Sequence, residues 1–101
     1  MRRTVKSRNR RRDDPSSDCW FVYILRCVDG SLYTGISKDV NRRCRQHNDG
    51  TASRYTRSRR PTKLVWQEAQ PGRSLALKRE AAIKAMTRRD KLALIRLKKA
   101  G

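Results

Sequence analysis

Five residues of this chain have side chains suited to chemistry at a phosphate group. In chain order they are Tyr23, Tyr33, Arg43, His47 and Glu80. Phenols and imidazoles exchange protons, a guanidinium binds phosphate in a two-pronged fork, and a carboxylate holds a hard divalent cation. Hydrolysis of a phosphodiester needs these parts: a base for water, cations for the transition state, and stabilisation of the leaving oxygen.

The two tyrosines would need help to act as bases. A free phenol has a pKa of about 10, so a neighbouring cation must lower it near neutral pH. Arg43 could supply that field, and His47, one helical turn later, could share the proton transfer. Glu80 would hold one Mg²⁺ or Mn²⁺ ion with several waters still attached. The residues leave open which tyrosine is the base.

The charge of the chain points to a polyanionic partner. The 101 residues fit one small domain, and 27 Lys and Arg against 9 Asp and Glu give a net charge of +18. Nucleic acid is the expected partner, and an acidic membrane surface or an acidic protein is the competing one.

The first 18 residues resemble a disordered basic arm followed by a single domain over residues 19–101. The arm holds 7 of the 27 basic and 3 of the 9 acidic residues, so the domain keeps a net charge of +14. The arm therefore does not explain the charge.

Aromatic and β-branched residues, a turn signal and a stretch of alternation predict three strands. Trp20–Val28 and Ser31–Ile36 should form a hairpin through a two-residue type I′ turn at Asp29-Gly30, and Thr62–Glu68 a third strand. The first strand is apolar on both faces, so it should be central. One face should carry Phe21, Tyr23, Leu25 and Cys27, and the other Val22, Ile24 and Arg26.

A helix is expected from a cap at Ser37 or Asp39 to about Asn48. Its inward stripe should consist of Val40, Arg43, Cys44 and His47. An arginine in a buried stripe requires a partner there: an acid, a carbonyl or a substrate phosphate.

Two further helices are expected, over Arg73–Met86 and Thr87–Lys99. The buried arc of the first should contain Leu75, Ala76, Ala82, Ile83 and Met86, with Glu80 at its edge. The predicted class is α+β (α/β in the broad sense), a small three-stranded antiparallel sheet flanked by helices.

The segment from Gly50 to Arg60 is predicted to be a mobile nucleic-acid-binding loop. It has no acid in its last seven residues, where cations for phosphate and a ring for stacking on a base occur together. The predicted contacts are Arg54, Tyr55, Arg57, Arg59 and Arg60. An ordinary solvated loop is the structural alternative.

The chain is expected to be cytoplasmic. Its three cysteines (Cys19, Cys27 and Cys44) have irregular spacing without a zinc-site pattern, which favours free thiols in a reducing compartment. No apolar run approaches the ~18 residues of a membrane span, and no secretion signal is recognisable. We therefore expect no membrane partner, and the oligomeric state is left open.

As an ordered set, these residues resemble the GIY-YIG endonuclease superfamily, especially its small stand-alone members of the UPF0213 type. The resemblance covers about residues 19–98. Its motifs are Val22-Tyr23-Ile24, Tyr33-Thr34-Gly35, the run from Ser37 to Arg43, Ser53–Arg57, Leu64-Val65-Trp66 and Lys78–Lys84.

The resemblance implies a metal-dependent endonuclease that hydrolyses DNA or, less favoured, RNA, with a role in repair, recombination or nucleic-acid processing. Tyr23 and Tyr33 would then handle protons, Arg43 would steady the phosphate, His47 would assist, and Glu80 would bind the metal. The alternative is a non-catalytic nucleic-acid-binding module of the same fold, which the residues taken singly favour.

Two positions depart from the family pattern. Phe21 stands where the first signature has glycine, and Ile36 stands where some repair members carry lysine. Loss of that lysine would remove a cation able to activate a phenol. Lys38 could compensate, and it is also assigned to nucleic-acid contact.

Overall fold

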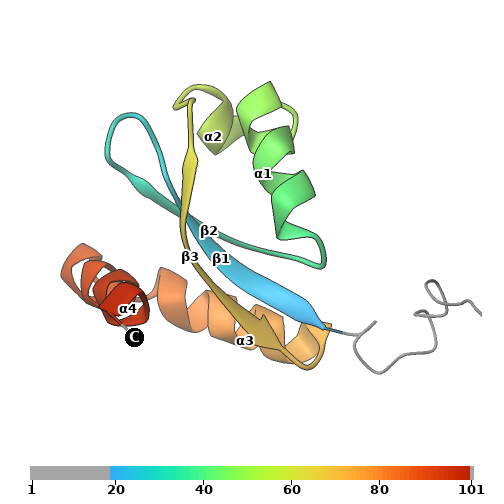
Figure 1. Ribbon diagram of the computed structural model, residues 1–101, viewed down its shortest axis with the longest axis vertical. Helices are drawn as coiled ribbons and strands as arrows, with labels where there is room; N and C mark the ends of the chain where they lie inside the picture. The colour runs from blue at the N-terminus through green and yellow to red at the C-terminus, as the bar shows by residue number, and fades with distance from the viewer. Residues whose placement is uncertain (1–18, 101) are drawn as a thin grey trace, which may run out of the picture.

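The structure is a computed structural model, and it describes residues 19–100; the predicted basic arm lies outside them. Three strands and four helices follow one another as β1(Trp20–Arg26), β2(Leu32–Ser37), α1(Val40–Asp49), α2(Arg54–Arg57), β3(Lys63–Gln70), α3(Arg73–Lys84) and α4(Arg88–Ala100). Figure 1 shows α1 and α2 on one side of the sheet and α3 and α4 on the other. The α+β prediction is confirmed.

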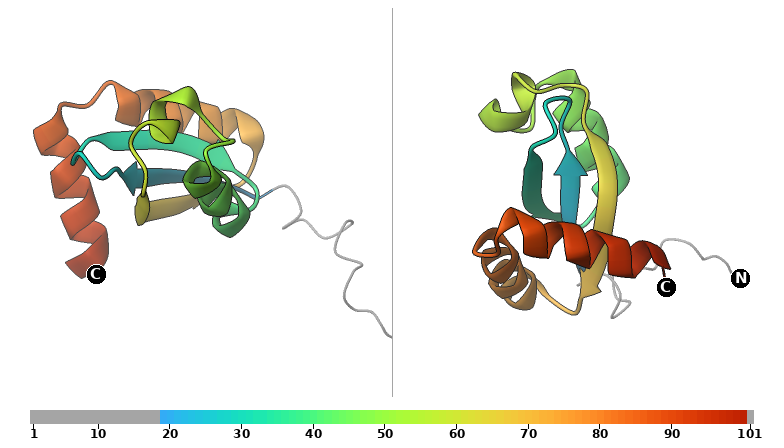
Figure 2. Two further views of the ribbon diagram at one scale, coloured as in Figure 1. Left: turned by 90° about the horizontal axis from the view of Figure 1, so that it is seen from above. Right: turned by 90° about the vertical axis from the view of Figure 1, so that its left-hand side faces the viewer.

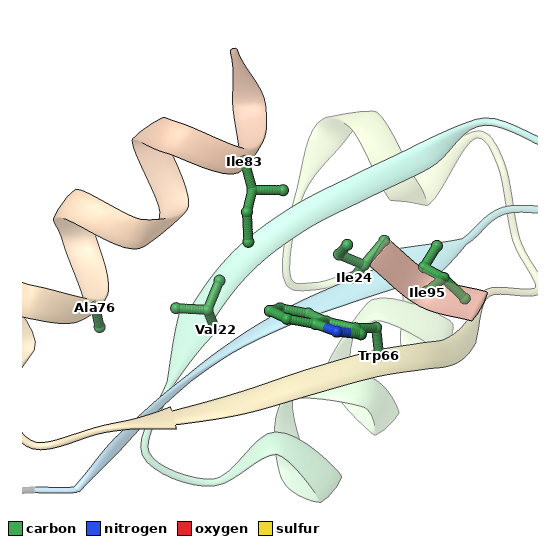
Figure 3. Packing of buried hydrophobic residues seen from close by; sticks show 6 residues of the cluster. All are labelled: Val22, Ile24, Trp66, Ala76, Ile83 and Ile95. Atoms are coloured by element: carbon green, nitrogen blue, oxygen red, sulfur yellow. The ribbon is translucent and has the colours of Figure 1, made fainter. Parts of the chain in front are cut away.

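The sheet is antiparallel with the order β2-β1-β3, so the prediction of a central first strand is confirmed. Its two faces carry different clusters, as the alternation of side chains requires. Toward α3 and α4 lie Val22, Ile24, Trp66, Ala76, Ile83 and Ile95 (Figure 3). Toward α1 lie Tyr23, Leu25 and Val40, with Phe21, Tyr33, Cys44 and Leu64 packed around them.

The hairpin between β1 and β2 differs from the predicted two-residue turn. The Cys27 amide donates to the Ser31 carbonyl, and the Gly30 amide donates to the Cys27 carbonyl, which leaves three residues in the loop. Gly30 has φ +86°, the left-handed region that glycine favours. This is a three-residue loop closed by a left-handed glycine, which suits strand twist as well as the predicted type I′ turn does.

Helix α1 has the limits that its caps predict. The Asp39 side chain accepts a hydrogen bond from the Arg42 amide, and Gly50 ends the helix with φ +84°. Val40 and His47 are buried, and Arg43 and Cys44 are half-buried, so the predicted inward stripe is confirmed. Arg43 and His47 thereby face the sheet.

Helix α3 covers the opposite face of the sheet with a narrower stripe than predicted. Ala76 and Ile83 are buried, but Leu75 is 46% exposed and Ala82 is also exposed. The prediction of Leu75 and Ala82 in the core was wrong, because only the stripe of α3 that contains Ala76 and Ile83 packs against the sheet. Figure 2 shows α4 crossing the same face beside α3.

The predicted loop after α1 contains a short helix, α2, which begins after Ser53. The Ser53 side chain accepts from the Tyr55 amide and so caps that turn. Thr56, in the middle of α2, is fully buried against α1. This segment is therefore packed onto the domain through a buried side chain, unlike the mobile loop that the sequence predicts.

Candidate active site

A chain of buried hydrogen bonds joins three segments on the α1 side of the sheet. The Tyr23 phenol oxygen lies 2.9 Å from Nε2 of His47, and Nδ1 of His47 lies 2.7 Å from Oγ1 of Thr56. All three side chains are at most 1% exposed. β1, α1 and α2 each contribute one member, so the chain forms only when the three segments pack together.

The direction of these hydrogen bonds follows from counting donors. A neutral imidazole has one N–H, so His47 can donate to Thr56 or to Tyr23 but not to both. If His47 donates through Nδ1, Thr56 can donate to the Ser53 carbonyl at 3.4 Å, and Tyr23 donates to Nε2. Only this tautomer gives both hydroxyl protons an acceptor among the described residues.

The surroundings of this hydrogen-bonded series keep the Tyr23 phenol protonated. Burial and the nearby Tyr33 raise the pKa of Tyr23 to about 12, although Arg43 acts in the opposite direction. Burial, reinforced by the positive charge of Arg43, lowers the pKa of His47 to about 4. Arg43 thus acts on the pKa of Tyr23 in the predicted direction, but desolvation outweighs its field, so the net shift of this phenol is upward.

Glycine is required at position 35 by a close approach of Tyr23. These two residues are direct partners in the β1–β2 register. A Cβ built on Gly35 would lie 2.6 Å from the Tyr23 phenol oxygen and 2.8 Å from Cζ. The Tyr23 ring therefore packs closely against Gly35 of β2, with its hydroxyl within hydrogen-bond distance of His47.

Arg43 provides a cation at the rim of this cluster. It is half-buried, and its NH1 donates to the amide oxygen of Gln46 at 3.1 Å. Among residues 19–100, no carboxylate lies within ion-pair distance of Arg43. The sequence predicts an acid, a carbonyl or a substrate phosphate as the partner of Arg43, and the structure supplies a neutral carbonyl. The positive charge of Arg43 therefore remains available to bind an anion.

Tyr33 connects the buried cluster with the surface. Its ring meets His47 edge-on at 5.0 Å and Tyr55 at 5.9 Å between ring centroids. Tyr33 is half-buried and Tyr55 is 38% exposed, whereas Tyr23 is 1% exposed. Of the two signature tyrosines, Tyr33 is therefore the more accessible to a substrate.

The arginines predicted to bind nucleic acid fall into two groups. Arg59 pairs with Asp29 at 3.1 Å and lies 3.9 Å over the ring of Tyr55, and Arg60 donates to the Arg57 carbonyl at 2.9 Å. These two hold the segment together, and Asp29 is an acid that only the fold brings near. Arg54 and Arg57 are exposed on α2.

Glu80 comes from the other side of the sheet. Its half-buried carboxylate lies 3.4 Å from Lys84 Nζ. The described residues contain no group of three or more His, Cys, Asp and Glu placed to share a metal. A cation here would have one protein carboxylate and take its other ligands from water or phosphate, as Mg²⁺ commonly does.

The geometry of α3 shows which way Glu80 points. Successive helical residues are about 100° apart, so Arg79 and Glu80 lie on opposite flanks of the Ala76–Ile83 stripe. Arg79 reaches β3, where it pairs with Glu68 at 2.8 Å. Glu80 therefore lies on the flank of α3 away from β3, on the side of β2.

Comparison with known proteins shows which family the chain belongs to. The profile of the GIY-YIG catalytic domain matches residues 19–93. The chain is 56% identical over 79 residues to a UPF0213 protein of Staphylococcus aureus strain Mu3, covering 78% of this chain and 96% of the relative. The UPF0213 protein of strain MW2 matches equally. The chain belongs to the GIY-YIG family.

A solved structure agrees with the fold of this GIY-YIG domain. The solution NMR structure of a UPF0213 protein from Bacillus halodurans has a TM-score of 0.53 and 44% identity, covering 79% of this chain and 85% of that one. Family membership implies a nuclease-type function and a nucleic-acid substrate. Within residues 19–100, no helix combines the length and apolar composition needed to cross a bilayer.

The Ile36 departure from the family pattern has a structural explanation here. Ile36 pairs with Val22 and packs against the cluster beneath α3, on the face opposite Tyr23. A lysine at that position would begin on the wrong face of β2 to approach the Tyr23 phenol directly. Lys38, in the turn after β2, lies beside the ring of Trp20, 5.8 Å from its centroid.

Sequence reasoning missed three contributors to the site of this GIY-YIG domain: Gly35, Gln46 and Thr56. Gly35 was noted only as part of a motif, and Thr56 only as part of the Ser53–Arg57 segment. The three-residue spacing of Arg43 and Gln46 on a helix allows their contact, and it is the one signal that the sequence offers. Nothing in the sequence predicts that Thr56 meets His47.

Proposed function

We propose that this protein is a divalent-metal-dependent endonuclease that cuts DNA, with RNA as the less favoured substrate. The observation that carries the proposal is the half-buried Arg43, which has no carboxylate partner among the described residues and adjoins the Tyr23–His47–Thr56 chain. A cation held without a counter-ion beside proton-exchanging groups suits a scissile phosphate better than a purely structural role.

Each side chain has a distinct task in this proposal. Arg43 binds the non-bridging oxygens of the phosphate and offsets the charge that develops on them. Tyr33, the more accessible phenol, exchanges the proton of the attacking water. Tyr23 stays protonated, and with His47 and Thr56 it positions Tyr33 and the phosphate.

Glu80 is the proposed metal ligand. A bound Mg²⁺ or Mn²⁺ ion would supply Lewis-acid stabilisation of the phosphate and of the leaving oxygen. In favour is the position of the half-buried Glu80 on the flank of α3 opposite to the Arg79–Glu68 pair, on the side of β2. Its lysine partner, Lys84, is exposed and one turn away, so that pairing is weak and easily exchanged.

The test is a cleavage assay on single-stranded, duplex and branched DNA and on RNA, with Mg²⁺, Mn²⁺ or EDTA. Arg43→Ala and Tyr33→Phe should lower the rate by at least about 100-fold, the usual scale for a lost electrostatic or proton-transfer group. Glu80→Gln should abolish the metal-dependent rate.

Glu68→Gln is the matched control, because Glu68 is also half-buried and reached by α3 but pairs with Arg79. It should cut at nearly the wild-type rate. Tight binding without cleavage of any substrate in either metal would refute the proposal and favour a non-catalytic binding module. Equal loss in the Glu68 and Glu80 variants would refute the metal assignment.

A further inference from the structure

A hollow of about 460 Å³ opens on the surface beside Arg43. Its walls come from four segments. They are Trp20 at the start of β1, Ile36 and Ser37 at the end of β2, the following turn with Lys38 and Asp39, and α1 with Arg42, Arg43 and Gln46. Its volume lies in the roughly 300–1,000 Å³ range of pockets that hold small organic ligands. We call it the Trp20 pocket.

The lining of the Trp20 pocket combines an aromatic ring with excess positive charge. Lys38 Nζ lies 5.8 Å and Arg73 Cζ 5.7 Å from the centroid of the Trp20 ring. Lys38, Arg42 and Arg43 outnumber the one acid of the lining, Asp39. That carboxylate already accepts the Arg42 amide as the cap of α1, so part of its hydrogen-bonding capacity is used.

Adjacent arginines on α1 can serve different groups of a ligand. Arg42 and Arg43 are consecutive, so their side chains leave the helix about 100° apart. Arg43 is half-buried toward the tyrosine cluster, whereas Arg42 is exposed. One ligand could therefore have two anionic groups held by neighbouring guanidinium groups, as successive phosphates of a strand require.

We propose that the Trp20 pocket binds the nucleotide next to the scissile phosphate, with its base on Trp20 and its own phosphate at Lys38 and Arg42. This deepens the proposed function and rests on it for the position of the scissile phosphate at Arg43. A base can reach Trp20 only when it is out of a duplex stack. The substrate class is therefore a strand that is unpaired at this nucleotide: a single strand, a flap or a frayed end.

The experiment measures binding in EDTA, so that it is independent of cleavage. A labelled single-stranded DNA oligonucleotide and the duplex of the same sequence are titrated by fluorescence anisotropy with the full chain. Trp20→Leu should weaken single-strand binding about 5- to 150-fold, the fold-change of one lost base–aromatic stack, and change duplex binding less than about twofold. Trp20→Phe, which keeps a ring, should retain most of the affinity.

The salt dependence separates the two parts of the pocket. The double variant Lys38→Ala/Arg42→Ala should reduce the slope of log K against log salt by about 1.4, at about 0.7 for each lost phosphate contact with a single strand. Trp20→Leu should leave the slope unchanged. Arg96→Ala, an exposed arginine on α4, is the single-charge control and should leave single-strand discrimination intact.

A third readout uses fluorescence, which does not need the leucine variant to fold. The chain has two tryptophans, and Trp66 is 3% exposed, so the emission lost in Trp20→Phe reports on Trp20. Single-stranded oligonucleotide should quench that component. If Trp20→Leu weakens the binding of single strand and duplex equally, or if saturating oligonucleotide does not quench Trp20, the proposed binding role of the pocket is wrong even if the protein cuts DNA. If binding is selective for the single strand but no substrate is cleaved, the binding role stands and only the proposed nuclease activity is refuted.

Discussion

Replacing Gly35 with alanine should displace Tyr23 and disable the site. The new Cβ would lie 2.8 Å from Tyr23 Cζ and 2.6 Å from the phenol oxygen. An ordinary carbon–carbon contact is about 3.5 Å, so the ring must move by about 0.7 Å. Tyr23 is 1% exposed and lies 2.9 Å from His47, so such a shift strains or breaks that buried hydrogen bond.

The magnitude follows from two separate costs. Overpacking a well-packed site costs about 1–3 kcal/mol, and a lost hydrogen bond about 0.5–1.5 kcal/mol. Gly35→Ala should therefore lower the free energy of unfolding by about 2–4 kcal/mol, which for a domain of this size lowers Tm by roughly 10–30 °C. Urea unfolding followed by tryptophan fluorescence measures this change, with an unchanged m-value expected.

Two variants make the measurement specific to the contact. Gly72→Ala is the matched control, because a Cβ there would meet nothing within 4 Å, and it should change stability by less than about 1 kcal/mol. Tyr23→Phe removes the nearest atom, so Gly35→Ala should cost less in that background by about 1 kcal/mol. A cost as small as that of Gly72→Ala, or one identical in both backgrounds, would refute the reasoning.

Three further predictions concern the buried chain and its surroundings. Thr56→Val removes the hydrogen bond to His47 and should lower the free energy of unfolding by about 1–3 kcal/mol in urea, whereas Thr56→Ser should lower it less. In the wild type, the ¹⁵N chemical shifts of the His47 ring should show that Nδ1 carries the proton. Because the folded protein lowers the pKa of His47 from 6.5 to about 4, the unfolded chain takes up that proton first as the pH falls. Unfolding free energy should thus decline by up to about 3 kcal/mol as pH falls from 6.5 to 4, and urea melts of His47→Gln should lack that part of the decline. Asp29→Asn removes an exposed ion pair with Arg59 and should change stability by less than about 1 kcal/mol in the same assay; a larger effect would show that the pair orders the Tyr55 segment.

The elements of the fold could be predicted because their signals are local. The nearly continuous apolar run of Trp20–Arg26 predicts a strand that is apolar on both faces, and such a strand belongs at the centre of the sheet. Asp39 and Gly50 mark the two ends of α1 because a cap acts within one turn of the helix. The inward stripe with Arg43 and His47 follows from the helical period alone.

Other features depended on surfaces that the sequence does not describe. The exposure of Leu75 reflects how much sheet is available beneath α3, and a helical period cannot give that width. The backbone hydrogen bond between Cys27 and Ser31 fixes the hairpin loop at three residues. The Asp-Gly pair is compatible with a two-residue or a three-residue loop, so the sequence does not decide between them. The ion pair of Arg59 joins residues 30 positions apart.

For the site, the sequence by itself determined which functional groups are present and on which face of its strand or helix each one lies. Residue type and a repeat of two or 3.6 place Tyr23 and Tyr33 on strands and Arg43 and His47 on one stripe. Only the tertiary structure decided that Thr56 orients His47, that Gly35 accommodates the Tyr23 ring, and that burial raises the pKa of that phenol to about 12. The physical reason is that backbone periodicity acts over a few residues, whereas desolvation and side-chain contact depend on the neighbours that other segments bring.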